Sequence, residues 1–208
     1  MALKDNKIKS SIIDFVNYFN VNEIPYVLIG GLAVNIWGRI RSTLDVDFIF
    51  DQNKTDLDDF YDYLVSKGYI LDINDLDLGI KERINITIWS GTFRIDIKGI
   101  YNNFAKKSIE MAHKVTLFGV DINVDSPELL IVSKICYGSE QDFEDAASIY
   151  LRLISQKRLN IDILEQFVND LKIEDRIFLL RKLLKSQLNE SELEEAIDKL
   201  KPFDFNKF

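Results

Sequence analysis

The chain has 208 residues, of which 47% are hydrophobic and 29% are charged, a balance typical of a folded globular protein. Its single cysteine, Cys136, excludes a disulfide framework and a Cys-based zinc cluster, and its single histidine, His113, argues against His-rich metal sites and His-based catalytic triads. The formal net charge of −8 argues against a general nucleic-acid binder and against a protein of anionic membrane surfaces.

The sequence gives no sign of a membrane partner. No apolar run approaches the roughly 20 residues that cross a bilayer. The first residues lack the charged and then apolar layout of a signal peptide. We therefore expect a cytoplasmic protein.

The first 50 residues alternate between helical and strand patterns. Apolar residues at helical spacing predict helices, and short apolar runs predict buried strands. In chain order these segments are a helix over 8–19, a strand over 26–29, a short helix over 32–37 and a strand over 45–50. Gly30 and Gly31 mark a tight turn after the first strand, and a polar loop over 38–43 precedes the second.

Residues 55–125 continue with one helix and several strands. The helix is predicted over 55–67, and Gly68 ends it. The strands are predicted over 69–73, 83–89, 92–100, 114–118 and 120–124. Ser90-Gly91 and Gly119 are typical of hairpin turns between neighbouring strands.

The pattern becomes helical at Ser126, which can cap a helix that has Pro127 in its first turn. Breaks are predicted near Gly138, Asn160, Lys172 and Asn189. The expected fold is thus α/β (α+β), with an α/β domain over 1–125 and an all-helical domain over 126–208.

Three aspartates are candidate metal ligands. Asp45 and Asp47 are two apart on one predicted strand, so their side chains share a face, and a divalent cation would relieve their repulsion. Asp96 lies on a later strand that can pair beside the first. Three such carboxylates can hold the two ions of a phosphoryl-transfer site. The alternative is the solvated face of a half-buried sheet.

Gly30 and Gly31 are candidate phosphate-binding residues. Glycines at a strand-to-helix turn let a phosphate approach the backbone, and the free amides of the new helix favour an anion. Taken alone, such a turn also occurs with no ligand. The glycines, Asp45-x-Asp47 and the later Asp96 together favour a site.

This combination resembles the DNA polymerase beta-like nucleotidyltransferase superfamily. Gly30-Gly31-x-Ala33 and Arg41-x-Thr43-x-Asp45-x-Asp47 are similar to its AbiEii-type branch, which includes toxins of toxin-antitoxin pairs. A later segment, Lys134 followed by Asp142-x-x-Asp145, resembles another element of that branch, in which the lysine contacts nucleotide phosphates. The matches span roughly residues 24 to 150.

The resemblance implies a catalytic nucleotidyltransferase domain over 1–125, with a small mixed β-sheet flanked by helices. It also implies two Mg²⁺ ions, with Mn²⁺ as an alternative, held by Asp45, Asp47 and Asp96, and a role for Asp96 in deprotonating the acceptor hydroxyl. The implied nucleotide-binding residues are Gly30, Gly31, Arg41, Thr43, Lys134, Asp142 and Asp145.

Two positions depart from the branch: Gln141 stands where a basic residue is frequent, and Gly31 where serine is frequent. Lys134 can instead be a solvated helix residue. Asp142 and Asp145 can form an exposed acidic face or pair with an arginine such as Arg152.

The implied activity is transfer of an NMP from an NTP to an acceptor hydroxyl, on an RNA or tRNA end or on a protein. The chain would then fit the toxin of a toxin-antitoxin pair, with an antitoxin protein as partner. The alternatives are a small-molecule (antibiotic-type) nucleotidyltransferase, a glycosyltransferase that uses Asp-x-Asp, and an inactive nucleotide-binding or interaction protein.

Overall fold

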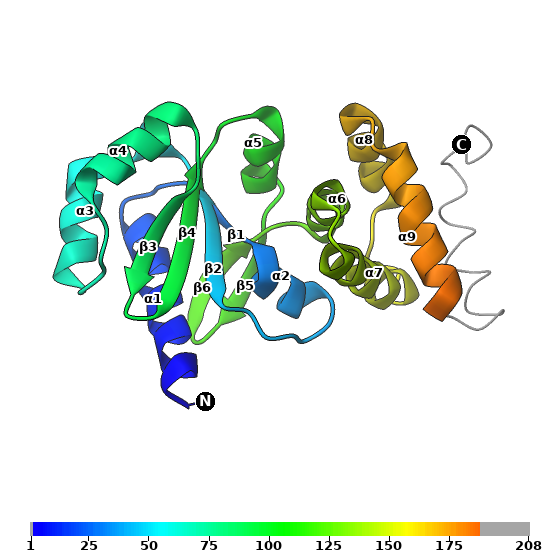
Figure 1. Cartoon of the computed structure of the whole chain (residues 1–208), viewed down its shortest axis with the longest axis horizontal. Coiled ribbons are helices and arrows are strands. Elements are labelled where there is room, and N and C mark those ends of the chain that lie inside the picture. The colour runs from blue at the N-terminus through cyan, green and yellow to red at the C-terminus, as the bar shows by residue number, and fades with distance from the viewer. Residues whose placement is uncertain (1, 188–208) are drawn as a thin grey trace. The chain divides into compact units, whose positions relative to one another are not determined.

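The computed structural model describes residues 2–187, and their side chains over 7–186. The contacts divide the chain into two compact units. The first unit comprises the residues up to Ala33 together with Arg41–Asp125, and the second comprises Val34–Ile40 and the chain from Ser126 onward. Figure 1 labels the elements of both.

A mixed six-stranded sheet forms the centre of the first unit, as the fold class predicts (Figure 1). Its strand order is β3-β4-β2-β1-β6-β5. The strands are β1 (Tyr26–Ile29), β2 (Asp45–Phe50), β3 (Ile86–Ser90), β4 (Phe93–Gly99), β5 (His113–Leu117) and β6 (Val120–Val124). Pairs β2–β4 and β1–β6 are parallel, and the other neighbours are antiparallel.

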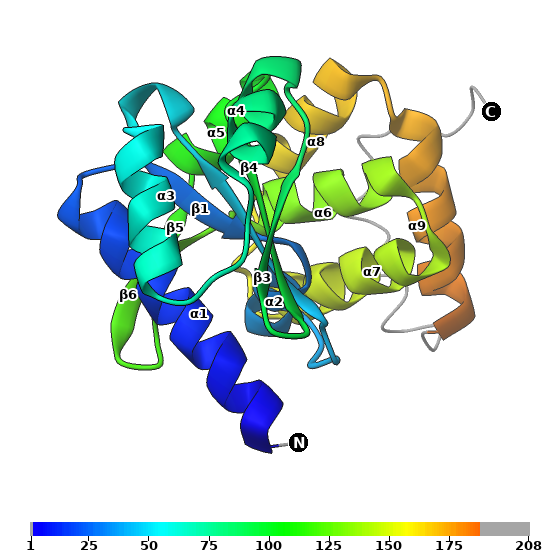
Figure 2. The ribbon, with the colours of Figure 1, turned by 60° about the vertical axis from the view of Figure 1, so that its left-hand side comes forward.

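Helices cover both faces of this sheet. They are α1 (Ala2–Val21), α3 (Leu57–Ser66), α4 (Ile73–Glu82) and α5 (Asn103–Glu110), with a 3₁₀ turn over Gln52–Lys54. Figure 2 shows α1 and α3 side by side on one face, where Phe15 and Phe19 of α1 stack on Phe48 and Phe50 of β2. On the other face Ala105 of α5 packs with a small apolar cluster.

The side chains of β2 alternate between the two faces of the sheet, and this places its two aspartates on one face. Val46, Phe48 and Phe50 are buried on the aromatic side, whereas Ile49 joins the cluster under α5. Asp45 and Asp47 share the face of Ile49 and are only partly buried. The sheet therefore presents its carboxylates where the apolar packing of α5 has ended.

The second unit is helical, as predicted. Its helices are α6 (Pro127–Tyr137), α7 (Glu140–Ser155), α8 (Ile161–Leu171) and α9 (Glu174–Gln187). Ser126 caps α6 as expected, Asn160 caps α8, and Gly138 and Lys172 end α6 and α8 in left-handed conformation. The break predicted near Asn189 lies outside the described residues.

Two helices of the first unit were not predicted. The expected strand over 69–73 is reduced to a single bridge between Ile70 and Trp89, and α4 begins at Ile73. Both helices are short, with ten residues in α4 and eight in α5, so each has only two or three turns of apolar pattern. Each is nevertheless capped by a side chain, Asp72 for α4 and Asn102 for α5.

A bilayer cannot be crossed by any helix in the described part of the chain, since none is both long and apolar enough.

Candidate active site

The register of two parallel strands brings the three aspartates together. Asp47 of β2 is the direct partner of Asp96 of β4, and Asp45 is the partner of Arg94. Partners on adjacent strands point to the same face of a sheet. The expected pairing of the Asp96 strand with the Asp45–Asp47 strand is confirmed.

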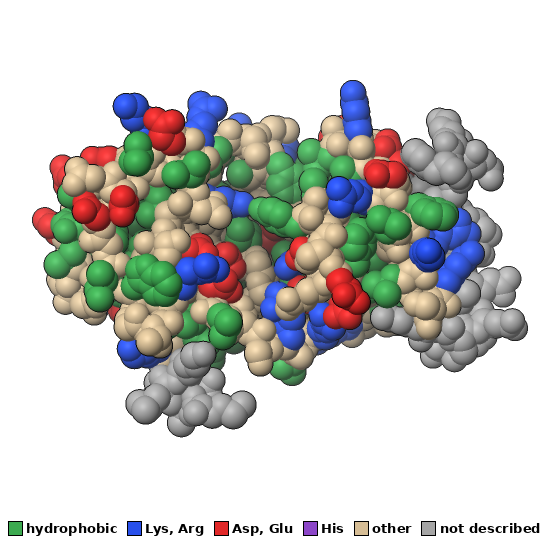
Figure 3. All heavy atoms as spheres, viewed as in Figure 1, with side chains coloured by type: hydrophobic (Ala, Val, Ile, Leu, Met, Phe, Trp, Pro, Cys, Tyr) green, Lys and Arg blue, Asp and Glu red, His purple; other side chains and the backbone are tan. Residues whose placement is uncertain are grey.

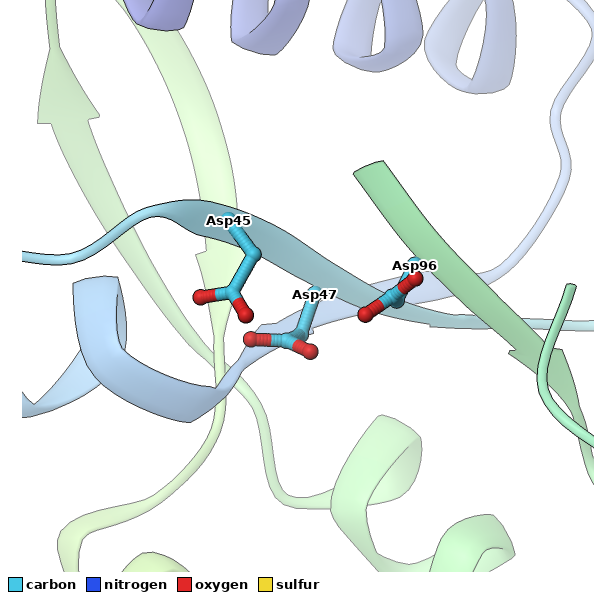
Figure 4. Close-up of side chains that lie close together, drawn as sticks. All are labelled: Asp45, Asp47 and Asp96. Atoms are coloured by element: carbon cyan, nitrogen blue, oxygen red, sulfur yellow. The ribbon is translucent and has the colours of Figure 1, made fainter. Parts of the chain in front are cut away.

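The three carboxylates converge. One ligand oxygen from each of Asp45, Asp47 and Asp96 lies within 4.8 Å of the others. All three side chains are partly buried, and Figure 4 shows them directed toward a common space, two from β2 and one from β4. Like charges this close repel unless a cation lies among them.

Two threonines fix the outer carboxylates. The Thr43 hydroxyl donates to Oδ1 of Asp45 at 3.0 Å, and the Thr87 hydroxyl donates to Oδ1 of Asp96 at 2.7 Å. Thr43 was predicted to bind nucleotide, and in the structure it contacts a candidate metal ligand. Thr87 was not predicted, although its place opposite Asp96 in the β3–β4 hairpin sets the contact.

Arg94 is a second residue that the sequence analysis missed. Its Nη2 lies 2.7 Å from Oδ2 of Asp45, and its Nε lies 2.9 Å from Oδ2 of Asp96. The hydrogen bond to Asp45 raises the pKa of Arg94 against the opposing effect of desolvation, and the charges of Asp96 and Asp47 raise it further. The two-residue spacing Arg94-x-Asp96 places both side chains on one face of a strand, but the contact with Asp45 depends on the register of β2 with β4.

Gly30 and Gly31 begin α2 (Gly30–Trp37), and Gly30 lies next to Asp47. Gly30 has φ +69°, and a Cβ at this position would collide with the Asp47 carboxylate. A Cβ on Gly31 would lie 2.6 Å from Oγ1 of Thr43 and 3.0 Å from Nη2 of Arg41. Glycine at position 30 therefore lets the start of this helix approach Asp47, and glycine at position 31 leaves room for the Thr43 and Arg41 side chains.

The later predicted residues form a separate cluster inside the second unit. Nζ of Lys134 lies 2.9 Å from Oδ1 of Asp142 and 3.2 Å from Oδ2 of Asp145. Oδ1 of Asp145 in turn accepts from Nε and Nη2 of Arg39, each at 3.2 Å, and Arg39 also contacts Glu144 at 2.7 Å. Asp145 thus joins two cations.

Lys134, Asp142 and Asp145 are largely buried and form ion pairs with one another. The Asp145 side chain is fully buried and that of Lys134 is 11% exposed, so Lys134 is not the freely solvated residue of the alternative interpretation. Burial acts to raise the pKa of Asp142, but hydrogen bonds from Ser139 and the ion pair with Lys134 outweigh it and lower that pKa. Arg152 is not their partner: it donates to the carbonyls of Ile36 and Gly38.

The donor set at Asp45, Asp47 and Asp96 fits a divalent ion. Mg²⁺ prefers carboxylate oxygens, and it binds through a few carboxylates together with substrate phosphates. The Arg94 guanidinium bridges Asp45 and Asp96, so a cation is compatible with this pair of carboxylates. Asp45, Asp47 and Asp96 are thus the residues that would hold the metal.

Two solved structures of one antibiotic-resistance factor share this fold. The chain is 14% identical to the antibiotic-resistance factor ANT(2'')-Ia in its solution structure, over 86% of this chain and 97% of that chain, with a TM-score of 0.53. A crystal structure of ANT(2'')-Ia with adenylyl-2''-tobramycin matches at 12% identity over 79% and 98%, with a TM-score of 0.52. A lincomycin-bound lincosamide antibiotic adenylyltransferase, LnuA, matches at 16% over 67% and 94%, with a TM-score of 0.49.

Sequence comparison gives the family. No curated protein matches the chain in sequence. The model of one protein family, described as nucleotidyltransferase of unknown function (DUF6036), matches residues 10–179, which include every predicted site residue. The chain belongs to this nucleotidyltransferase family.

Proposed function

We propose that this chain is a divalent-metal-dependent enzyme that transfers an NMP from an NTP to an acceptor hydroxyl and releases pyrophosphate. The observation that carries the proposal is the convergence of Asp45, Asp47 and Asp96 beside the glycine turn at Gly30. Two carboxylates on one strand and a third from its parallel neighbour are suited to a phosphoryl-transfer centre.

Each carboxylate has a proposed role. Asp45 and Asp47 would hold two Mg²⁺ ions, or Mn²⁺ in their place, and the metal when bound neutralises charge on the triphosphate. Asp96 would accept the proton of the acceptor hydroxyl, since a general base must lie within hydrogen-bond reach of the proton it removes. Thr43 and Thr87 would keep Asp45 and Asp96 oriented through their hydroxyl groups.

The phosphates would lie against the start of α2. The amides of the first helical turn lack helix partners and favour an anion there, and Gly30 and Gly31 leave the backbone open to it. Arg41, whose guanidinium lies beside Gly31, would add a charge-assisted contact. The assignment of Lys134, Asp142 and Asp145 to nucleotide binding rests on the motif resemblance alone.

The acceptor is proposed to be an RNA end or a protein hydroxyl, as in the AbiEii-type branch. The chain would then act as a toxin in the cytoplasm, with NTPs as its substrate. A small-molecule acceptor is the second candidate. It is favoured by the fold shared with ANT(2'')-Ia, since the match spans nearly all of that antibiotic-resistance factor. The net charge of −8 also weakens the RNA option.

Labelling identifies the acceptor class. The purified chain is incubated with each α-labelled NTP, Mg²⁺ and a whole-cell extract, which is then separated into RNA, protein and small metabolites. We expect label in one fraction with the wild-type chain and none with Asp47→Asn. Equal labelling by the two proteins, or no transfer from any NTP, would contradict the proposal.

The toxin assignment has its own test. Induced expression of the wild-type chain should arrest growth, and expression of Asp47→Asn should not. Co-expression of the open reading frame next to the gene for this chain should restore growth. Normal growth under wild-type expression, in cells where labelling shows transfer, would favour the small-molecule candidate.

A further inference from the structure

A basic side chain lies among the candidate metal ligands. Arg94 contacts Asp45 through Nη2 and Asp96 through Nε, and both contacts are made to the Oδ2 atoms. The Oδ1 atoms of the same two carboxylates accept from Thr43 and Thr87. Each outer carboxylate thus has one oxygen held by a neutral hydroxyl and the other held by a charged group.

We propose that Arg94 is a built-in competitor of the divalent cation: it neutralises Asp45 and Asp96 while the metal is absent and must be displaced from them when the metal binds. This inference rests on the proposed metal-dependent function and concerns how the same site is regulated. Its consequence is that Arg94 sets the metal concentration at which the site fills.

The two cations compete for the same carboxylates. A guanidinium that donates from Nη2 to Asp45 and from Nε to Asp96 occupies a lone pair on one candidate ligand oxygen of each. A divalent ion bound in that space would repel the guanidinium at a separation of a few ångströms. The hydroxyl bonds of Thr43 and Thr87 carry no such conflict, since a hydroxyl is neutral.

Displacement of Arg94 is feasible because its side chain is accessible. The side chain is 45% exposed, against 27% for Asp45 and 12% for Asp96. A long side chain at the surface of a strand has other rotamers that reach water, and partly exposed ion pairs contribute little net free energy. The metal therefore competes with two breakable contacts rather than with a buried structural bridge.

Mn²⁺ titration tests the competition directly. Mn²⁺ binding in the absence of nucleotide is measured by electron paramagnetic resonance and by calorimetry for the wild-type chain, Arg94→Gln and Lys114→Gln. The last variant removes an equal charge from β5, an edge strand that β2, β1 and β6 separate from β4. We expect Arg94→Gln to bind Mn²⁺ about tenfold more tightly and Lys114→Gln to match the wild type.

Thermal unfolding gives a second measurement. Without its counter-ion the aspartate cluster is repulsive, so the Arg94→Gln protein should melt below the wild type in metal-free buffer and gain more from added Mn²⁺. Arg94→Lys keeps the charge but cannot make both contacts at once. Its affinity for Mn²⁺ should therefore lie between those of the wild type and Arg94→Gln.

The outcomes separate the two proposals. Measurable Mn²⁺ binding by the wild type, with equal or weaker binding by Arg94→Gln, would overturn the competition and leave the proposed function standing. If Arg94→Gln does not fold, an affinity of Arg94→Lys equal to that of the wild type would overturn it. Wild-type binding no stronger than that of Asp47→Asn would remove the metal site itself, and the inference with it.

Discussion

Asp96 accepts from a neutral hydroxyl across the hairpin and from the guanidinium two residues before it. These contacts orient its carboxylate toward Asp47, its partner across the strands. An amide in place of the carboxylate would keep the shape of this group and remove its capacity to accept a proton.

Asp96→Asn should therefore retain NTP binding and lose turnover. We expect kcat to fall by about 10²- to 10⁴-fold, the range for loss of a general base, with little change in nucleotide affinity. Single-turnover transfer and calorimetric NTP binding measure the two effects, and Thr116→Ala on β5 is the control. Unchanged turnover would place the base at another residue.

Asp145 is the central residue of the ion-pair cluster of the second unit. Its carboxylate is fully buried and serves both Lys134 and Arg39, so truncation would leave two cations without their shared partner. Loss of one member of a buried pair costs far more than loss of a surface partner.

We expect Asp145→Ala to lower the free energy of unfolding by about 3 kcal/mol or more. The matched control is Glu144→Ala, which removes a partly exposed partner of the same Arg39 and should cost less than about 1 kcal/mol. Urea unfolding measures both variants. Equal effects would mean that Asp145 adds no more than a surface contact.

The lowered pKa of Asp142 predicts a pH dependence. A carboxyl whose pKa is lower in the folded than in the unfolded chain contributes stability that is present above its unfolded pKa. This contribution disappears as the pH falls through the folded pKa, because the carboxyl is then protonated in both states. The stability difference between the wild type and Asp142→Asn should thus be constant near neutral pH and shrink below about pH 4. A difference independent of pH in acid would contradict the ion pair with Lys134.

At the level of elements, the start of α2 has the strictest backbone requirement of the site. Gly30 and Gly68 both have positive φ, +69° and +81°, but only Gly30 faces a functional group. A Cβ on Gly68 would meet nothing within 4 Å, whereas one on Gly30 would displace the Asp47 carboxylate. Comparison of substitutions at the two glycines therefore distinguishes the effect of backbone strain from the effect of displacing Asp47.

Alanine at either glycine should cost about 1–2 kcal/mol of stability, the penalty of a left-handed conformation for a residue with a Cβ. Gly30→Ala alone should also abolish Mn²⁺ and NTP binding, because it moves Asp47. Thermal unfolding and calorimetry of both variants compare the effects. Intact binding by Gly30→Ala would show that the turn can adapt.

The elements that carry the site could be predicted from sequence, and two supporting elements could not. Strands β1 and β2 match their predicted ranges because short apolar runs ended by glycine or aspartate are distinct signals. The apolar face of helix α4 consists of only three residues at helical spacing, Ile73, Leu76 and Ile80, and the strand predicted over 69–73 overlaps its first turn. The position of Arg94 needed the register of β2 with β4, which the spacing of residues along one chain does not give.

At the scale of the whole molecule, acidic side chains gather over α3 and α4 (Figure 3). Helices α3 and α4 and their N-caps carry seven exposed aspartates, Asp56, Asp58, Asp59, Asp62, Asp72, Asp75 and Asp77. This surface would repel a polyanion, so an RNA acceptor would have to approach from another side.

The domain division predicted near residue 125 stays a prediction, and the contacts add one detail that sequence could not supply. Val34–Ile40 groups with the helices after Ser126, although its neighbours on both sides belong to the first unit. Arg152 and Ser148 of α7 bind the backbone of this segment. Such long-range pairs leave no periodic pattern in a sequence.

The candidate site forms only when β2 and β4 pair in the correct register. Sliding β4 by a single position would turn Asp96 to the aromatic side of the sheet and bring an isoleucine opposite Asp47. A chain trapped in that arrangement would keep most of its secondary structure and yet be inert. Specific activity per folded molecule would then reveal a wrong strand register, which circular dichroism does not detect because the secondary-structure content is nearly unchanged.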